Sequence, residues 1–242
     1  MKKIPEATRG PRPVNGEIRV APPGSTQRIQ RFYEDNPSVG VLPRPFEVLD
    51  DAIEQGLATE ILVEGKTIAV ALVFPLATSP PLLEFGGARV ESRWEGRGLQ
   101  KKLFLARFCA VAQALGGVDG YRIVSGASPI KSPKSITSIQ RMGFLPFEIP
   151  PSALLNACCT CPDRAEIVTG RACCCNFYHL GRDALLDGIE EFAALPSFTV
   201  PSSDDGTEVR IDNRVLTETA KVQLRDLFQH RELLGSGPQR IK

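Results

Sequence analysis

The chain has 242 residues, of which 42% are hydrophobic and 24% charged, a composition typical of a folded globular protein. Its 29 Lys and Arg residues nearly balance 28 Asp and Glu residues, which excludes a general nucleic-acid binder because such proteins carry a basic excess. No run of about 18 apolar residues is present to span a membrane. Met1–Pro5 lacks the apolar core of a signal peptide, so we expect a cytoplasmic protein.

The N-terminal third combines strand and helix signals. Residues 1–16 hold three prolines and two glycines without apolar periodicity, which predicts a flexible lead-in. The elements expected next are a strand at Glu17–Ala21, a helix at Gln27–Asp35 capped by Ser25 or Thr26, and a helix at Phe46–Gln55. Two strands, Ala58–Val63 and Lys66–Phe74, follow around a Glu64-Gly65 turn.

The middle of the chain alternates strands and helices. A strand at Leu82–Val90 is interrupted by Gly86-Gly87, which indicates a bulge or a close approach of another group to the backbone. We then expect a helix at Gly98–Leu115, a strand at Tyr121–Ser125, a helix at Ser132–Met142 and strands near Phe147 and Phe177. This order predicts the α+β (mixed α/β) class.

The C-terminal part has a different character. The pattern predicts a short helix at Asp183–Ala194, a linker at Pro196–Gly206, a strand stub at Val209–Ile211 and a charged amphipathic helix at Arg214–Leu233. The last helix has three open interpretations. It pairs two subunits into a homodimer, it covers a substrate site, or it is a solvated face.

A glycine turn between the Leu82–Val90 strand and the following helix is the most informative feature. Gly96 and Gly98 let backbone N–H groups face inward, and the helix N-terminus favours an anion there. Arg97 and Lys101, four residues apart, add positive charge suited to a diphosphate. In the alternative interpretation the glycines only shape a turn and the basic residues are solvated.

Two segments resemble motifs of the GNAT acyltransferase superfamily. Val90–Leu103 (VESRWEGRGLQKKL) is similar to its acyl-CoA-binding motif, in which a valine and an aromatic residue precede Arg-Gly-x-Gly-Leu and a helix. Ser132–Phe144 (SPKSITSIQRMGF) is similar to the later helix that ends in Gly-Phe. The resemblance covers about residues 17–150. It implies a central mixed, mostly antiparallel sheet flanked by helices over 17–182. The Cys-rich segment 158–175, about which the resemblance implies nothing, would be an insertion in this domain, and 183–242 a C-terminal extension.

The resemblance also implies a function. It suggests an N-acetyltransferase that moves acetyl from acetyl-CoA, or another acyl group from its CoA ester, to a small-molecule amine or a lysine by direct attack. The cofactor-binding residues would be Val90, Glu95, Gly96, Arg97, Gly98, Leu99, Gln100, Lys101 and Ser135. The sequence departs from the family at Glu95, where an Arg or Gln is usual, and at Ile139, where a tyrosine often acts as general acid. The acid is therefore unassigned among Ser135, Ser138, Tyr178 and water.

Glu84 is the candidate general base. It lies on the strand that leads into the glycine turn, where a carboxylate can accept a proton from an amine. A glutamate on the equivalent strand has this role in many members of the superfamily. The alternative is a strand glutamate paired with a neighbouring Arg or Lys.

Six of the seven cysteines lie between Cys158 and Cys175. Cys158 and Cys161 have the spacing for two zinc ligands, and Cys173 and Cys175 are able to complete a Zn²⁺ site. Redox or disulfide chemistry and simple packing are the alternatives. Cys109, on an apolar helix, is expected to pack in the core.

Two other functions stay open at this point. One is a Cys-rich metal- or redox-sensing module on a GNAT-like fold. The other is an acyltransferase that takes its acyl group from acyl carrier protein, with Arg93, Arg97, Lys101 and Lys102 facing that acidic partner.

Overall fold

The computed structural model describes residues 14–38, 44–78, 81–115, 122–127, 133–148, 176–202, 208–218 and 220–222. In chain order the elements are β1 Val14–Val20, α1 Thr26–Asp35, α2 Phe46–Glu54, β2 Ala58–Val63, β3 Lys66–Thr78, β4 Pro81–Val90, η1 Ser92–Trp94, α3 Leu99–Ala114, β5 Arg122–Ala127, α4 Pro133–Arg141, β6 Leu145–Pro146, β7 Asn176–Leu180, α7 Arg182–Ala193, β8 Ser197–Pro201 and β9 Glu208–Arg214.

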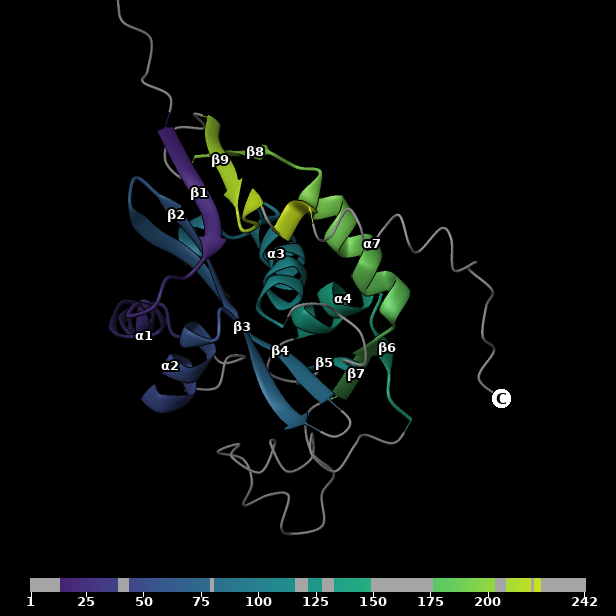
Figure 1. Cartoon of the computed structure of the whole chain (residues 1–242). Helices are drawn as coiled ribbons and strands as arrows, with labels where there is room; N and C mark the ends of the chain where they lie inside the picture. Colours follow the sequence, from purple (N-terminus) through teal and green to yellow (C-terminus); the bar gives the residue numbers. More distant parts are fainter. Residues whose placement is uncertain are drawn as a thin grey trace, which may run out of the picture.

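One mixed sheet organises the described residues (Figure 1). Its strand order is β6-β7-β5-β4-β3-β2-β1-β9-β8. Neighbours from β1 to β4 are antiparallel, as are the β5–β7, β6–β7 and β8–β9 pairs. Only β4–β5 and β1–β9 are parallel. The predicted α+β class, with a mixed and mostly antiparallel sheet flanked by helices, is therefore confirmed.

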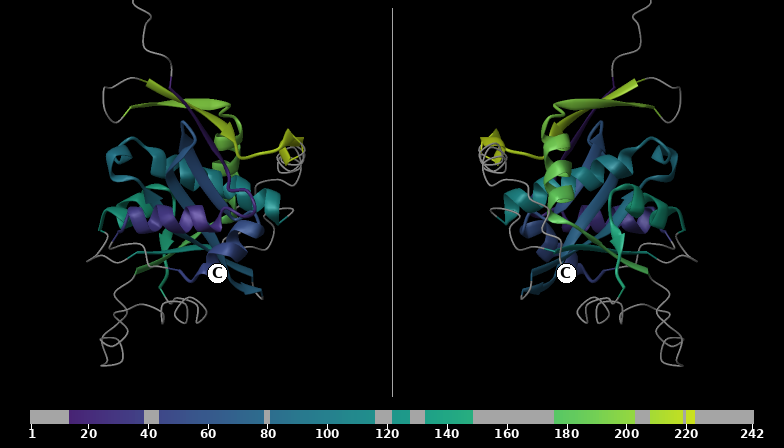
Figure 2. Two further views of the ribbon diagram at one scale, coloured as in Figure 1. Left: turned by 90° about the vertical axis from the view of Figure 1, so that its left-hand side faces the viewer. Right: turned by 90° about the vertical axis from the view of Figure 1, so that its right-hand side faces the viewer.

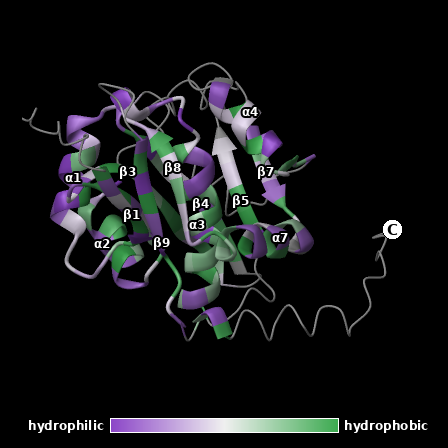
Figure 3. Ribbon diagram, turned by 90° about the horizontal axis from the view of Figure 1, so that it is seen from above, coloured by the Kyte–Doolittle hydropathy of each residue, from purple (hydrophilic) through white to green (hydrophobic). Residues whose placement is uncertain are grey.

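Helices cover both faces of this sheet. The two side views in Figure 2 each place a different helical layer in front, and the view from above in Figure 3 separates α1 and α2 from α7. Alternate side chains of β3 account for the division. Val70, Leu72 and Phe74 pack with the α1–α2 layer, whereas Ala71 and Val73 pack with α3 and α7.

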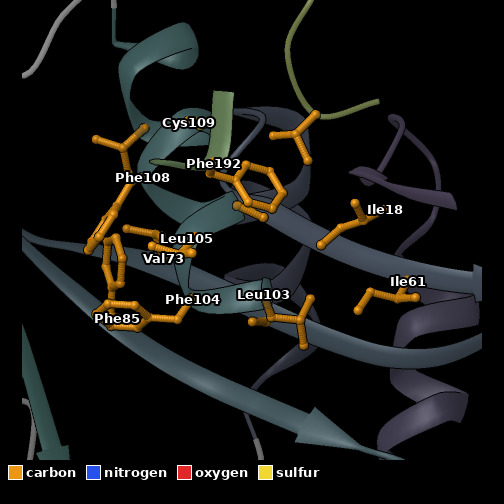
Figure 4. Close-up of a cluster of buried hydrophobic side chains, with 14 of the residues drawn as sticks. Ile18, Ile61, Val73, Phe85, Leu103, Phe104, Leu105, Phe108, Cys109 and Phe192 are labelled. Carbon is orange, nitrogen blue, oxygen red and sulfur yellow. The ribbon is translucent and has the colours of Figure 1, made fainter. Parts of the chain in front are cut away.

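The larger core lies under α3. Rings of Phe85, Phe104 and Phe108 form its centre, with centroids of Phe104 and Phe108 4.7 Å apart and those of Phe85 and Phe104 5.6 Å apart (Figure 4). Both of those pairs meet edge to face, the geometry that aromatic quadrupoles favour. Helix α7 packs against α3 on the outside, where Phe192 is fully buried. This packing fixes α3, whose first turn follows the glycine turn.

The C-terminal part corrects several boundaries. The linker expected at Pro196–Gly206 is wrong, because β8 occupies Ser197–Pro201 and pairs with β9. Strand β9 is longer than the expected stub and adds to β1 in parallel. The helix expected from Arg214 begins later, since Arg214 ends β9, and residues 218 and 220–222 are helical. Residues from 223 onward, with most of that predicted helix, lie outside the described part.

The remaining boundaries move by a few residues. β3 continues beyond Phe74 to Thr78, and β1 starts at Val14, inside the predicted lead-in. The rest of that lead-in lies outside the described residues. Ser25, one of the two predicted caps, is the N-cap of α1. Its side chain makes no capping hydrogen bond. Its hydroxyl instead accepts a bond from Arg28.

A buried carboxylate ties α1 to the sheet. The Glu60 side chain on β2 is 0% exposed. It accepts hydrogen bonds from Arg19 Nε at 3.0 Å and Arg28 Nη2 at 2.9 Å, with a second bond from Arg28 Nη1. Thr67 adds a longer bond of 3.4 Å. A charge removed from water is tolerated here because two guanidinium groups compensate it.

Glu60→Gln is expected to lower the free energy of unfolding by about 2 kcal/mol, because it leaves two arginines facing a neutral group. The loss is smaller than for a fully buried pair, since the Arg19 and Arg28 side chains are 32% and 38% exposed. Urea unfolding measures it. Glu218→Gln, which removes an exposed pair with Lys221, is the control and should cost less than about 0.5 kcal/mol. Equal losses of unfolding free energy in the two variants would contradict the role of Glu60 as a buried carboxylate that ties α1 to the sheet.

Cys109 packs in the core as expected, and burial raises the pKa of its thiol to about 12. Because the thiolate is the reactive form, iodoacetamide should label it about 1000-fold more slowly in the folded than in the unfolded protein at pH 8. The folded state holds this proton more tightly, so the free energy of unfolding should fall as pH rises from about 9 to about 12. Peptide mapping of labelled protein checks the rate. Rapid labelling without urea would contradict it.

Candidate active site

Strands β4 and β5 separate partway along their length. Their parallel register joins only Leu82–Glu84 to Arg122–Val124, although β4 continues to Val90 and β5 to Ala127. The Ser125 hydroxyl donates to the Phe85 carbonyl at 3.0 Å, just beyond the last paired residue. Further along, the part of the chain described here gives that edge of β4 no strand partner. An extended ligand is therefore able to bind between the two strands, using the backbone groups of β4.

The glycine turn lies where β4 ends. Trp94 in η1 is buried and anchors the turn, and Gly96 and Gly98 follow with φ of +78° and +76°. Gly98 is the N-cap of α3 and, as a glycine, has no side chain with which to cap the helix. The first N–H groups of an α-helix have no partner within the helix. A Cβ at Gly96 or Gly98 would meet no atom within 4 Å, so the turn is open to a ligand.

Arg97 points toward the C-terminal part of the chain. Its Nη1 donates to the carbonyls of Pro201 and Ser202 at the end of β8, and its Nη2 donates to the Arg93 carbonyl at 3.1 Å. The guanidinium also lies 5.5 Å from the centroid of the Trp94 ring. Arg97 thus connects the glycine turn to β8. A phosphate would have to compete with these carbonyls for its guanidinium.

The lysines of the first turn of α3 are more available. Lys101 pairs with Glu191 of α7 at 3.0 Å, and both side chains are at least half exposed. Such a pair is weak and easily exchanged for a stronger anion. Lys102 lies 5.2 Å from the Phe198 ring centroid, and partial burial lowers its pKa. Gln100 is exposed, whereas Leu99 is buried and holds the helix onto the sheet.

Glu95, where the family usually has an Arg or Gln, does not leave a bare negative charge at the turn. Arg89 on β4 donates to its carboxylate at 2.8 Å. Arg89 also donates to the carbonyl of Asn36 at 2.9 Å, so it connects the turn to the end of α1. Val90 itself is buried and pairs with Ala69 of β3. The pair with Arg89 therefore compensates the Glu95 carboxylate before any ligand binds.

Glu84 lies on the face of β4 that is covered by the α1–α2 layer. Nη2 of Arg44, which lies just before α2, is 3.2 Å from each Glu84 oxygen. The Arg44 guanidinium lies 4.5 Å from the Phe74 ring centroid, and both charged side chains are mostly buried. Glu84 is therefore paired with an arginine, which is the alternative interpretation that its sequence position allowed. Each carboxylate oxygen still has a lone pair for a further donor.

The second motif forms α4 and the turn after it. Ser135, in its first turn, is partly exposed, and the Ser138 hydroxyl donates to the Lys134 carbonyl at 3.0 Å. Ile139, at the frequent tyrosine position, is buried in the core. Tyr178 on β7 is buried too, opposite Ser125 of β5. These positions leave the general acid unassigned.

The predicted zinc ligands Cys158, Cys161, Cys173 and Cys175 lie outside the described residues. Within the described ranges no group of three or more His, Cys, Asp and Glu side chains is placed to hold a metal ion. Over the same ranges, no helix combines the length and apolarity needed to cross a membrane.

Three residues near Glu84 were missed by the sequence analysis. Arg107, on α3, is 4% exposed and donates to backbone carbonyls of β3 and β4. Tyr33 on α1 donates to the Gly87 carbonyl, and Arg44 pairs with Glu84. The sequence does contain one signal for Arg107, which is the single arginine within the apolar stripes of the predicted Gly98–Leu115 helix. Nothing local in the sequence marks Tyr33 or Arg44.

The mixed, mostly antiparallel sheet flanked by helices is the architecture that the resemblance implies. The fold is similar to that of the GNAT superfamily. No family model and no curated protein matches its sequence.

Solved structures similar to this chain include acetyltransferases. The chain is similar to Arabidopsis thaliana Naa50 in complex with the bisubstrate analogue CoA-Ac-MVNAL, at 10% identity and TM-score 0.47, over 69% of this chain and 98% of that one. It is also similar to Rv2747 from Mycobacterium tuberculosis in complex with CoA and NLQ, at 15% identity and TM-score 0.47, over 67% and 97%. N-acetylglutamate synthase from Neisseria gonorrhoeae matches at 17% identity and TM-score 0.45 over 69% of this chain, which spans only 35% of that protein.

Proposed function

We propose that this protein is an acyl-CoA-dependent N-acyltransferase that transfers acetyl from acetyl-CoA to a primary amine. One observation carries the proposal. The open amides at the N-terminus of α3 follow, after η1 and the glycine turn, a strand whose last half has no strand partner on the β5 side among the described residues. A diphosphate site and a channel for an extended arm are therefore continuous.

The separation of the two ends of the site fits this substrate class. Glu84 and Val90 are six residues apart on β4, a distance of about 20 Å along an extended strand. The substrate must place its reacting group that far from its phosphates. Acyl-CoA does so, because its pantetheine arm joins the diphosphate to the thioester and carries amides that pair with a strand backbone.

The residues then have distinct tasks. The amides from Gly96 to Gln100 bind the diphosphate, since the Glu95 amide donates to the Ser92 carbonyl, and Lys101 turns from Glu191 to a phosphate oxygen. Backbone groups near Val90 and the Ser135 hydroxyl complete the proposed contacts. Arg97 holds β8 beside the turn and offers its charge at longer range.

Glu84 is the proposed base. It accepts a proton from the ammonium group of the acceptor, directly or through water, while Arg44 keeps its carboxylate oriented. The free amine attacks the thioester carbonyl, so that an N–C bond forms and the C–S bond breaks. The second proton lost by the nitrogen passes to the departing sulfur, which leaves as the CoA thiol. The rest of the rate enhancement comes from holding the amine and the thioester next to each other in one channel.

The direct experiment is calorimetric titration with acetyl-CoA, followed by a screen of small amines, amino acids and lysine peptides read by mass spectrometry. We expect micromolar binding and a mass gain of one acetyl group on at least one amine class. No binding at micromolar concentrations would remove the enzymatic proposal. Preference for acyl carrier protein over CoA would favour the carrier-dependent alternative. No contact described here supports that alternative, since Arg93, Arg97 and Lys101 each bond to groups of this chain.

Gly98→Ala is expected to weaken acetyl-CoA binding about tenfold, because a methyl group would project into the open turn and crowd the amides. Gly65→Ala is the matched control. Gly65 has φ of +77°, close to the +76° of Gly98, and neither has an atom within 4 Å of an added Cβ. Both variants thus carry the same backbone strain. Equal affinity in the two variants would show that the turn does not contact the ligand.

A further inference from the structure

The pairing of β4 with β3 shifts register at two points, and the one between Val70 and Leu72 of β3 is a bulge in β4. Val70 pairs with Arg89 and Leu72 with Gly86, so the register passes over Gly87 and Ala88. Gly87 has φ of +58°, and an added Cβ there would come within 2.8 Å of the Leu72 side chain and 3.0 Å of the Tyr33 hydroxyl. The extra residue lies just beyond Glu84, next to the opening between β4 and β5.

Two side chains bind successive carbonyl groups of this bulge. Arg107 Nη1 donates to the Gly86 carbonyl at 3.1 Å and to the Leu72 carbonyl at 3.3 Å. The Tyr33 hydroxyl donates to the Gly87 carbonyl. Arg107 belongs to α3 and Tyr33 to α1, so the two donors come from the two helical layers on opposite faces of the sheet.

Arg107 is an unusual residue for the interior. Its side chain is almost fully buried, its Nε has no hydrogen-bond partner, and among the described residues it forms no ion pair with a carboxylate. Its guanidinium lies 4.6 Å from the Phe85 ring centroid and 5.4 Å from that of Phe104. Burial lowers its pKa, while Tyr33 and Glu84 are the titratable groups that face it. A buried, incompletely compensated cation is costly, and such groups concentrate at functional sites.

Peptide geometry connects these bonds to the backbone amides. In a trans peptide the C=O and the next N–H point in opposite directions. A donor on the Gly86 carbonyl therefore fixes the Gly87 N–H to point away from Arg107, and a donor on the Gly87 carbonyl fixes the Ala88 N–H to point away from Tyr33. Hydrogen bonds in such chains polarise one another, and a charged donor does so most strongly. The two donors lie on opposite faces of the sheet, so a single negative group meets only one of these amides, and the charged donor makes the Gly87 N–H the stronger of the two.

We propose that Arg107 and Tyr33 are positioning residues for acyl transfer: Arg107 orients and polarises the Gly87 amide toward the oxygen of the thioester, and Tyr33 fixes the bulge that presents this amide. That oxygen gains negative charge when the amine attacks, and preorganised amides stabilise it. This inference rests on the proposed function. Neither side chain contacts the substrate. Each acts through one peptide group.

The kinetic test compares Arg107→Met, Arg107→Lys and Tyr33→Phe with Arg28→Met. The last variant removes an arginine of α1 that binds Glu60 and does not contact the bulge. Hydroxylamine serves as a small neutral acceptor, and released CoA is measured chromatographically. We expect kcat to fall about 10- to 100-fold in Arg107→Met and about tenfold in Tyr33→Phe, with the Kd of acetyl-CoA within about threefold of wild type. Arg107→Lys should recover most of the loss.

An independent test needs no activity. In amide NMR spectra of the ligand-free protein, Arg107→Met should move the Gly87 amide proton upfield and Tyr33→Phe the Ala88 amide proton, because each loses the bond that polarises it. If both signals stay in place, or if kcat falls no further than in Arg28→Met, the inference is overturned. Equal losses of kcat and acetyl-CoA affinity would also overturn it, since they indicate a structural role. A wild-type protein that neither binds nor transfers would instead remove the proposed function, while the NMR result still decides the polarisation.

Discussion

Glu84→Gln is expected to lower the rate of transfer to an ammonium-type acceptor about 10²- to 10³-fold, with little change in acetyl-CoA affinity. Glutamine keeps the shape of glutamate, and its amide oxygen still accepts a bond from Arg44, which lies 3.2 Å from the carboxylate. It cannot accept the proton of the acceptor. The loss should therefore fall on the chemical step, which steady-state kinetics and calorimetry separate.

A base role can be distinguished from a structural one by changing the acceptor. Hydroxylamine is neutral at about pH 8 and has no ammonium proton to lose, so Glu84→Gln should retain most of the wild-type rate with it. Glu34→Gln, which alters an exposed carboxylate of α1, is the control and should change neither rate. A similar loss with both acceptors would mean that Glu84 only holds Arg44. The base would then have to be another group.

Gly188→Ala is expected to lower the free energy of unfolding by about 2–3 kcal/mol. Alanine normally stabilises a helix interior relative to glycine by about 0.5–1 kcal/mol. Here the added Cβ would overlap the ring of Phe108 and approach the Leu105 side chain at 3.4 Å. Helix α7 lies this close to α3 only because residue 188 has no side chain. Denaturant unfolding measures the loss.

The cause can be assigned with a double-mutant cycle. Phe108→Leu removes ring atoms next to residue 188, so Gly188→Ala should cost much less in that background than in the wild type. Phe108→Leu alone should be destabilising, because the ring packs against Phe85 and Phe104. If Gly188→Ala stabilises the wild-type protein, the close packing of α7 on α3 is wrong.

The elements with local signals were predicted well from the sequence. Ala58–Val63 matches β2 at both ends, and the strand that ends at Val90 and the helix entered through Gly98 are found within one or two residues. Apolar periodicity and glycine turns are properties of neighbouring residues, so the sequence contains them. The glycine turn was identified for the same reason.

The elements that depend on distant partners were predicted only in part, because the sequence indicated a short strand at Val209–Ile211 within β9 and a linker where β8 lies. β8 is a short edge strand with polar residues and a proline, and β9 is ordered by β1, about 195 residues earlier in the chain. Because the composition of this segment predicts a linker, nothing in the sequence indicates the bonds from Arg97 to Pro201 and Ser202. Arg107 was overlooked because a cation on an amphipathic helix is usually solvated, and the carbonyls that it binds come from two other strands.

The measurement closest to the central claim is an amide NMR titration of the intact protein with CoA. If the open turn binds the diphosphate and the separated strand the arm, the signals of Gly96, Gly98 and Leu99 should shift saturably together with those of the last half of β4. Saturable binding that leaves the Gly96–Leu99 amides unchanged would contradict the account, and so would the absence of any binding.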